Sequence, residues 1–108
     1  MNTVLIVCGA GASSTFLASR LRTLAKDRGL DLTAVPSSDS DVRPKLHSST
    51  VLLVGPHLAE SFDELRDEAA AFGIPAALLP PTAFGPSGAE DALDLVGSLV
   101  TLGSSSPR

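Results

Sequence analysis

The sequence predicts an α/β fold, with a single four-stranded parallel sheet covered by helices on both faces in three α/β/α layers. Short apolar segments alternate four times with segments of helical periodicity, which favours parallel strands joined by right-handed crossover helices. Residues 4–7 and 51–54 are apolar throughout, as in strands buried on both faces. The expected strand order is 2-1-3-4, with these two strands in the centre.

The composition limits the classes of protein to which this chain could belong. The 108 residues suit one compact domain, expected over residues 1–102, followed by a flexible polar tail over 103–108. Hydrophobic residues make up 44% of the chain and the mean hydropathy is +0.27, so the chain is globular. A net charge of −4 argues against a nucleic-acid partner. No apolar run reaches membrane-helix length, so direct membrane insertion is not expected.

The single cysteine of the chain also limits the cofactors and the cellular location that we expect. One cysteine cannot form an internal disulfide, and metal sites usually need several ligands. We therefore expect a cytoplasmic, reducing location, and neither a metal nor another cofactor.

The first strand leads directly into the candidate site. Cys8 ends the strand, the small residues of 9–12 follow, and Ser13 opens a helix expected over residues 13–28. The free N–H groups and dipole of a helix start favour an anion, most often phosphate. The same field lowers the pKa of a thiol and makes it nucleophilic. The predicted phosphate-binding loop comprises Gly9, Ala10, Gly11, Ala12, Ser13, Ser14 and Thr15.

The middle of the chain supplies two more strands. Leu17, Leu21 and Leu24 form the inner face of the first helix, and Gly29 ends it. Residues 30–35 alternate as in a half-exposed edge strand, and 36–40 are expected to form a loop or cap. A short helix over 41–47 precedes the third strand, which ends at the turn formed by Gly55, Pro56 and His57.

The last third repeats the pattern. Residues 58–72 are the clearest helix, with an inner face that comprises Leu58, Phe62, Leu65, Ala69 and Phe72. Gly73 ends it, and residues 74–79 form the fourth strand. A turn-rich connection over 80–88 leads to a final helix over 89–102, whose inner face contains Leu93, Val96 and Val100.

The ends of the first and third strands mark the expected binding crevice. Ligands of such folds bind at the carboxyl ends of the strands, where Cys8 and the turn at Pro56 and His57 would lie together. His57 could contact a phosphoryl group or a partner, although a surface histidine is commoner. His47 is expected at the surface. Arg20 and Arg22 could dock an acidic or phosphorylated partner, or only solvate their helix.

These residues resemble the IIB component of the lactose/cellobiose class of sugar phosphotransferase systems. The resemblance covers nearly the whole domain, and rests on the loop from Cys8 to Ser14, the arginine-bearing helix, residues 53–57 and the Phe84-Gly85 pair. Ala12 stands where methionine is common in the family, and His57 where glutamine is common. The galactitol- and ascorbate-type IIB relatives have similar cysteine loops.

The resemblance implies a phosphoryl relay. Cys8 would take a phosphoryl group from a phosphohistidine on a IIA partner and pass it to a sugar held by a membrane IIC partner. The thiolate would be the nucleophile, and the loop N–H groups would bind the equatorial oxygens. The chain has no Walker-type phosphate loop, so partners must bring the donor and acceptor.

Two alternatives share the predicted fold. A low-molecular-weight tyrosine phosphatase or arsenate reductase has arginine six residues after its cysteine, where this chain has Ser14, and an aspartate-proline acid that it lacks. A non-catalytic flavodoxin-like binding domain would carry an inert Cys8. Receiver-type chemistry is disfavoured because no strand ends in aspartate. Flavin binding usually requires flanking aromatic residues, and none here suits that role.

Overall fold

The computed structural model describes residues 2–7, 11–30, 32–37, 42–81, 85 and 88–99, with the backbone alone for residues 11–14, 43 and 57. The described part alternates strands and helices, as expected. In chain order the elements are β1 (Asn2–Val7), α1 (Gly11–Asp27), β2 (Leu32–Ser37), α2 (Val42–Leu46), β3 (Val51–Val54), the 3-10 helix η1 (Pro56–Ser61), α3 (Phe62–Ala71), β4 (Ala76–Leu78) and α4 (Gly88–Leu99).

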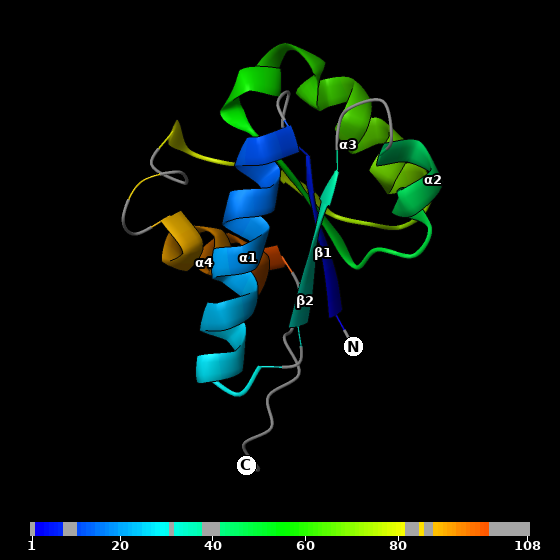
Figure 1. Ribbon diagram of the computed structural model, residues 1–108. Helices are drawn as coiled ribbons and strands as arrows, with labels where there is room; N and C mark the ends of the chain where they lie inside the picture. The colour runs from blue at the N-terminus through cyan, green and yellow to red at the C-terminus, as the bar shows by residue number, and fades with distance from the viewer. Residues whose placement is uncertain are drawn as a thin grey trace.

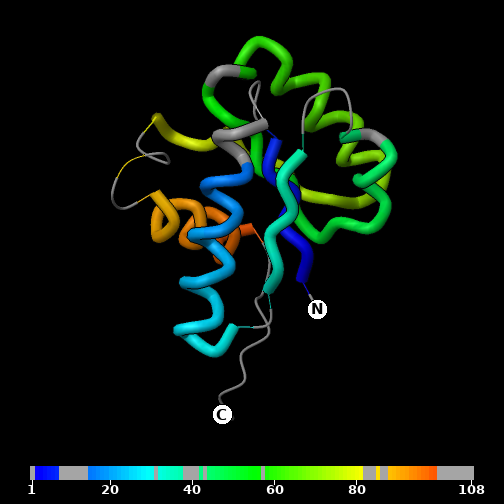
Figure 2. The backbone as a smooth tube through the Cα atoms, viewed as in Figure 1, coloured from blue at the N-terminus to red at the C-terminus, as the bar shows by residue number. Residues whose placement is uncertain are grey.

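The four strands form one parallel sheet in the order β2-β1-β3-β4, which confirms the predicted topology. Val7 is in register with both Ser37 and Val54, and Val54 is in register with Leu78. The strands therefore end level with one another at the carboxyl edge. Helices α1 and α4 cover one face of the sheet, and α2 and α3 cover the other (Figures 1 and 2).

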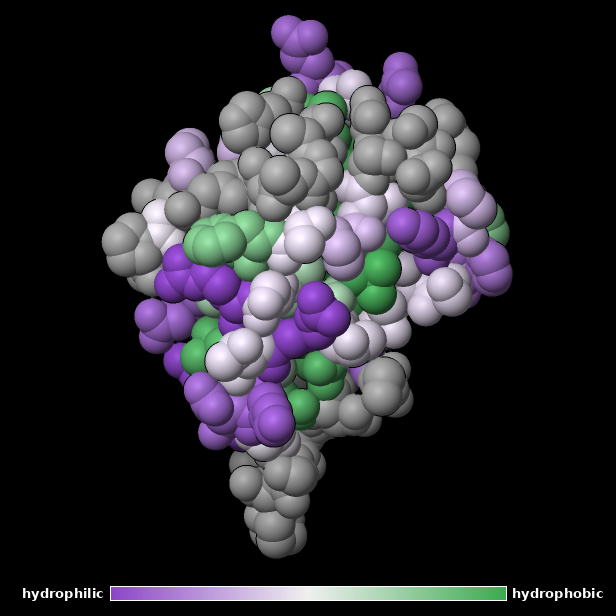
Figure 3. Space-filling view, in the orientation of Figure 1, coloured by the Kyte–Doolittle hydropathy of each residue, from purple (hydrophilic) through white to green (hydrophobic). Residues whose placement is uncertain are grey.

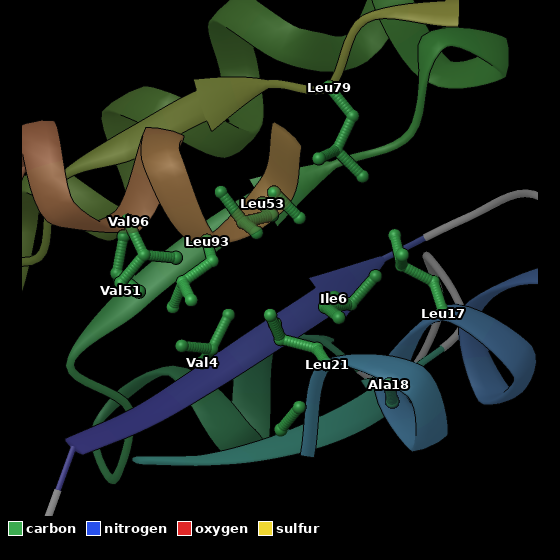
Figure 4. Packing of buried hydrophobic residues seen from close by; sticks show 12 residues of the cluster. Val4, Ile6, Leu17, Ala18, Leu21, Val51, Leu53, Leu79, Leu93 and Val96 are labelled. Atoms are coloured by element: carbon green, nitrogen blue, oxygen red, sulfur yellow. The ribbon is translucent and has the colours of Figure 1, made fainter. Parts of the chain in front are cut away.

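The central strands divide their side chains between two cores because successive strand residues point to opposite faces. Val4 and Ile6 of β1 face α1 and α4 in the first core, whereas Leu5 and Val7 belong to the second core, beneath α2 and α3. β3 alternates in the same way, and Figure 4 shows the first core. Every residue of β3 is fully buried, as predicted.

Helices α1 and α3 end with the same glycine motif. Gly29 and Gly73 have φ values of 68° and 73°, a conformation that glycine adopts at low cost. After α1, Leu30 N–H donates to the Ala25 carbonyl, and after α3, Ile74 N–H donates to the Ala69 carbonyl, both at 2.9 Å. These six-to-one bonds define Schellman caps, so the predicted helix stops are confirmed.

Several element boundaries differ from the expected ones. β2 runs two residues further than expected and includes Pro36, although the sequence predicts a loop or cap there. An edge strand tolerates proline because its outer side needs no hydrogen-bond donor. The expected helix over 58–72 begins instead as the 3-10 helix η1, directly after Gly55. α2 is confirmed, with Pro44 in its first turn.

The inner face predicted for the third helix is correct except at its end. Leu65 and Ala69 are buried, and Leu58 and Phe62 pack against the second core. Phe72, however, is 56% exposed. Phe72 is the C-cap residue, with non-helical backbone angles, so the helical periodicity no longer sets its direction. β4 is shorter than expected, while residues 103–108 and Val100 lie outside the described part.

Candidate phosphate-transfer site

The candidate site is built at the carboxyl edge of the two central strands. β1 ends at Val7 and α1 begins at Gly11. Cys8, Gly9 and Ala10 connect them and lie outside the described residues. The only cysteine of the chain therefore follows a central strand directly and precedes a helix start by three residues.

A backbone hydrogen bond ties this connection to the turn after β3. The N–H of Gly55 donates to the carbonyl of Val7 at 2.7 Å. That carbonyl belongs to the peptide bond that leads into Cys8. Gly55 is buried, and Leu58 N–H donates to its carbonyl at 3.0 Å. The ends of β1 and β3 therefore adjoin, as predicted.

The start of α1 differs from the expected one. The helix begins at Gly11, so Ser13, Ser14 and Thr15 lie within its first two turns and do not cap it. The first N–H groups of an α-helix lack an intrahelical acceptor. In α1 these include the N–H groups of Gly11, Ala12 and Ser13. The N–H of Thr15 faces the Gly11 carbonyl within the helix. The side chain of Thr15 is exposed.

The turn after β3 contributes the other predicted contacts. Pro56 begins η1 and is half-buried. The backbone of His57 lies in η1, while its side chain lies outside the described part. His47 is exposed, as predicted.

Arg20 lies further along α1, roughly 13 Å from Gly11 along the helix axis. Its Nη1 donates to the carbonyl of Gly85 at 3.4 Å. Its Cζ lies 5.5 Å from the centroid of the Phe16 ring. Gly85 belongs to the connection between β4 and α4, so Arg20 reaches back toward the carboxyl edge of the sheet.

Phe16 is a surface residue that the sequence analysis did not single out. It is 55% exposed, although large aromatic side chains usually bury most of their area. The sequence does contain a signal for this exposure. Leu17, Leu21 and Leu24 form the inner face of the helix. Phe16 and Arg20 therefore lie outside that inner face.

Two further observations concern the described part of the chain only. No helix there is long and apolar enough to cross a membrane. No three histidine, cysteine, aspartate or glutamate side chains of those residues come together in a group that could hold a metal ion.

The comparison with protein families decides between the alternatives. The family described as "PTS system, Lactose/Cellobiose specific IIB subunit" matches residues 3–94. The chain belongs to this family. It is therefore a IIB domain of a phosphotransferase system, and its role is phosphoryl transfer in sugar uptake. No curated protein matches the sequence.

Solved structures agree with the fold of this IIB domain. The lactose-specific IIB component domain from Streptococcus pneumoniae superposes with a TM-score of 0.82 at 16% identity, over 93% of this chain and 98% of that one. The cellobiose-specific IIB component from Borrelia burgdorferi gives 0.70 at 23% identity, over 91% of each chain. At these identities the similarity establishes the fold alone.

Proposed function

We propose that this IIB domain carries a phosphoryl group on Cys8, received from a phosphohistidine on a IIA protein and passed to a sugar bound by a membrane IIC protein. One observation carries the proposal: the only cysteine of the chain stands between a central strand and a helix start. The family match supports the class of reaction.

The first step exchanges one bond to phosphorus for another. The Cys8 thiolate attacks the phosphorus, and the phosphorus–nitrogen bond breaks as the imidazole leaves with the electron pair. Charge on the equatorial oxygens is stabilised by N–H groups that already point at them. The first N–H groups of α1, from Gly11 to Ser13, suit this role.

The second step releases the group. A sugar hydroxyl attacks the phosphorus, the phosphorus–sulfur bond breaks, and the thiolate is restored while the hydroxyl proton passes to a base of the sugar-binding partner. The chain has serine at position 14, so no arginine clamps the phosphoryl group as in the phosphatases. We therefore expect slow hydrolysis, which a carrier requires.

The location follows from the chemistry of the thiol. A free thiolate must stay reduced between cycles, and reducing compartments provide this. We place the domain on the cytoplasmic side for this reason. The carrier domain is proposed to span residues 1–102, with 103–108 as a tail.

Mass spectrometry tests the proposal directly. The purified chain is incubated with a phosphorylated IIA protein of the lactose/cellobiose class, and the adduct is mapped by peptide fragmentation. We expect one phosphate on Cys8, lost in Cys8→Ser and retained in His57→Ala. An unmodified, folded wild-type chain beside a fully phosphorylated donor would contradict the relay, as would rapid release of inorganic phosphate.

A further inference from the structure

We infer that the phosphorylated donor docks on a surface formed by Phe16, Arg20 and the groove beside them, between α1 and α4. This inference rests on the proposed function and names the part of the chain that selects the partner.

Phe16 and Arg20 form a pre-arranged pair at the surface. The guanidinium lies over the exposed ring at 5.5 Å and is also held by the Gly85 carbonyl at 3.4 Å. An exposed aromatic ring whose neighbour is already fixed loses little conformational freedom on binding. Aromatic and arginine side chains are also those that most often dominate protein interfaces.

The groove continues this surface along the junction of the two helices. It has a volume of about 320 Å³ and is lined by Ser19, Arg20, Thr23, Leu24, Asp27, Ala89 and Glu90. Arg20 stands at one end, and Asp27 and Glu90 stand further along, where Glu90 also pairs with Arg28 at 3.4 Å. The groove therefore offers a concave contact whose charge changes sign along its length.

The charge of α1 favours an anionic partner. α1 carries three basic residues and one acidic residue. By contrast, α3 carries four acidic residues and one basic residue, and α4 carries three acidic residues and no basic one. α2 carries two basic residues and no acidic one, so an acidic partner would be attracted by α1 and α2 and repelled by α3 and α4. Figure 3 shows hydrophilic and hydrophobic groups interspersed on the face that α1 covers.

The position fits the donor in particular. Arg20 reaches the connection at the carboxyl edge of the sheet, the same edge at which Cys8 follows β1. A phosphohistidine brings negative charge toward this edge, and transfer moves that charge onto the IIB domain. The attraction between α1 and the donor then falls, which favours release of the spent donor.

Binding measured without transfer tests the inference. A Cys8→Ala chain is titrated with the phosphorylated IIA protein, alone and combined with Phe16→Ala or Phe72→Ala. Phe72 is the matched control, because it is 56% exposed but lies at the far end of α3. We expect Phe16→Ala to raise Kd about tenfold and Phe72→Ala to leave it unchanged. Arg20→Gln should weaken binding and flatten its salt dependence.

The outcomes separate this inference from the relay. Equal affinities for the Phe16 and Phe72 variants would overturn the docking surface, as would no binding of the donor by the folded Cys8→Ala chain. Neither result depends on whether wild-type Cys8 becomes phosphorylated. Equal melting temperatures of the variants show that a loss of affinity is not a loss of folding.

Discussion

Helices α1 and α3 carry the same pair of side chains, yet they use it differently. Phe16 and Arg20 on α1, and Phe62 and Arg66 on α3, are each four residues apart with the guanidinium 5.5 and 5.7 Å from the ring. Phe62 packs against the core beneath α2 and α3. Phe16 remains 55% exposed.

The two arginines differ as well. Arg66 pairs with Asp63 and Asp67 of its own helix, at 3.4 and 3.9 Å. Arg20 instead reaches the carbonyl of Gly85, 65 residues further along the chain. The spacing of phenylalanine and arginine therefore does not define a role. The role follows from whether the ring falls within the inward-facing stripe of its helix.

The largest effect should come from the residue next to Phe16. Leu17 is 1% exposed in the core beneath α1 and α4, so Leu17→Ala should lower the free energy of unfolding by about 3 kcal/mol. Urea denaturation measures this. A cost as small as that of Phe16→Ala would mean that the inward and outward sides of α1 are wrongly assigned.

The two phenylalanines provide the next test. Phe62→Ala should lower the free energy of unfolding by about 1.5 kcal/mol, because the ring covers the second core. Phe16→Ala should change it by no more than about 0.5 kcal/mol. Thermal unfolding of both variants checks the difference. A larger loss of stability for Phe16→Ala than for Phe62→Ala would contradict the claim that only the α3 ring supports the core.

The glycine caps should respond alike on both helices. Gly29→Ala and Gly73→Ala each place a Cβ on a residue with positive φ, which should cost about 1 kcal/mol of unfolding free energy. At Gly73 a Cβ would meet no atom within 4 Å, so the cost there comes from the backbone. Urea denaturation of both variants measures the costs, and a neutral Gly73→Ala would argue against the Schellman cap.

The smallest effect should come from the ion pair of α3. Asp63 is an exposed acidic residue in the first turn of α3, paired with Arg66. Asp63→Asn should lower the free energy of unfolding by about 0.5 kcal/mol at low salt, and by less at high salt because ions screen exposed charges. A large, salt-independent loss would show that this pair supports the fold more than its exposure implies.

Much of the fold could be predicted from local patterns. The apolar runs of β1 and β3 identify the central strands, and Gly29 and Gly73 mark helix ends by a backbone requirement. The boundaries that were wrong depend on tertiary context. Pro36 continues a strand only because β2 is at the sheet edge, and Phe72 turns outward because the glycine cap redirects the chain.

The candidate site could be predicted in outline but not in its surroundings. The adjacency of the β1 and β3 ends follows from strand order, which the alternating pattern favours. The contact between Arg20 and Gly85 joins segments far apart in sequence, and no local pattern encodes it. For the same reason, only the folded structure shows that the exposed Phe16 ring lies beside an arginine that is held in place.

The short bond between Gly55 and Val7 has a mechanical consequence. It joins the ends of two strands that lie more than forty residues apart in the sequence, and the peptide group that contains the Val7 carbonyl moves as a planar unit. Any displacement of the η1 segment by a partner protein would act through this hydrogen bond on the peptide group that leads into Cys8. We therefore expect a protein that contacts the turn after β3 to influence the position of the proposed nucleophile as well.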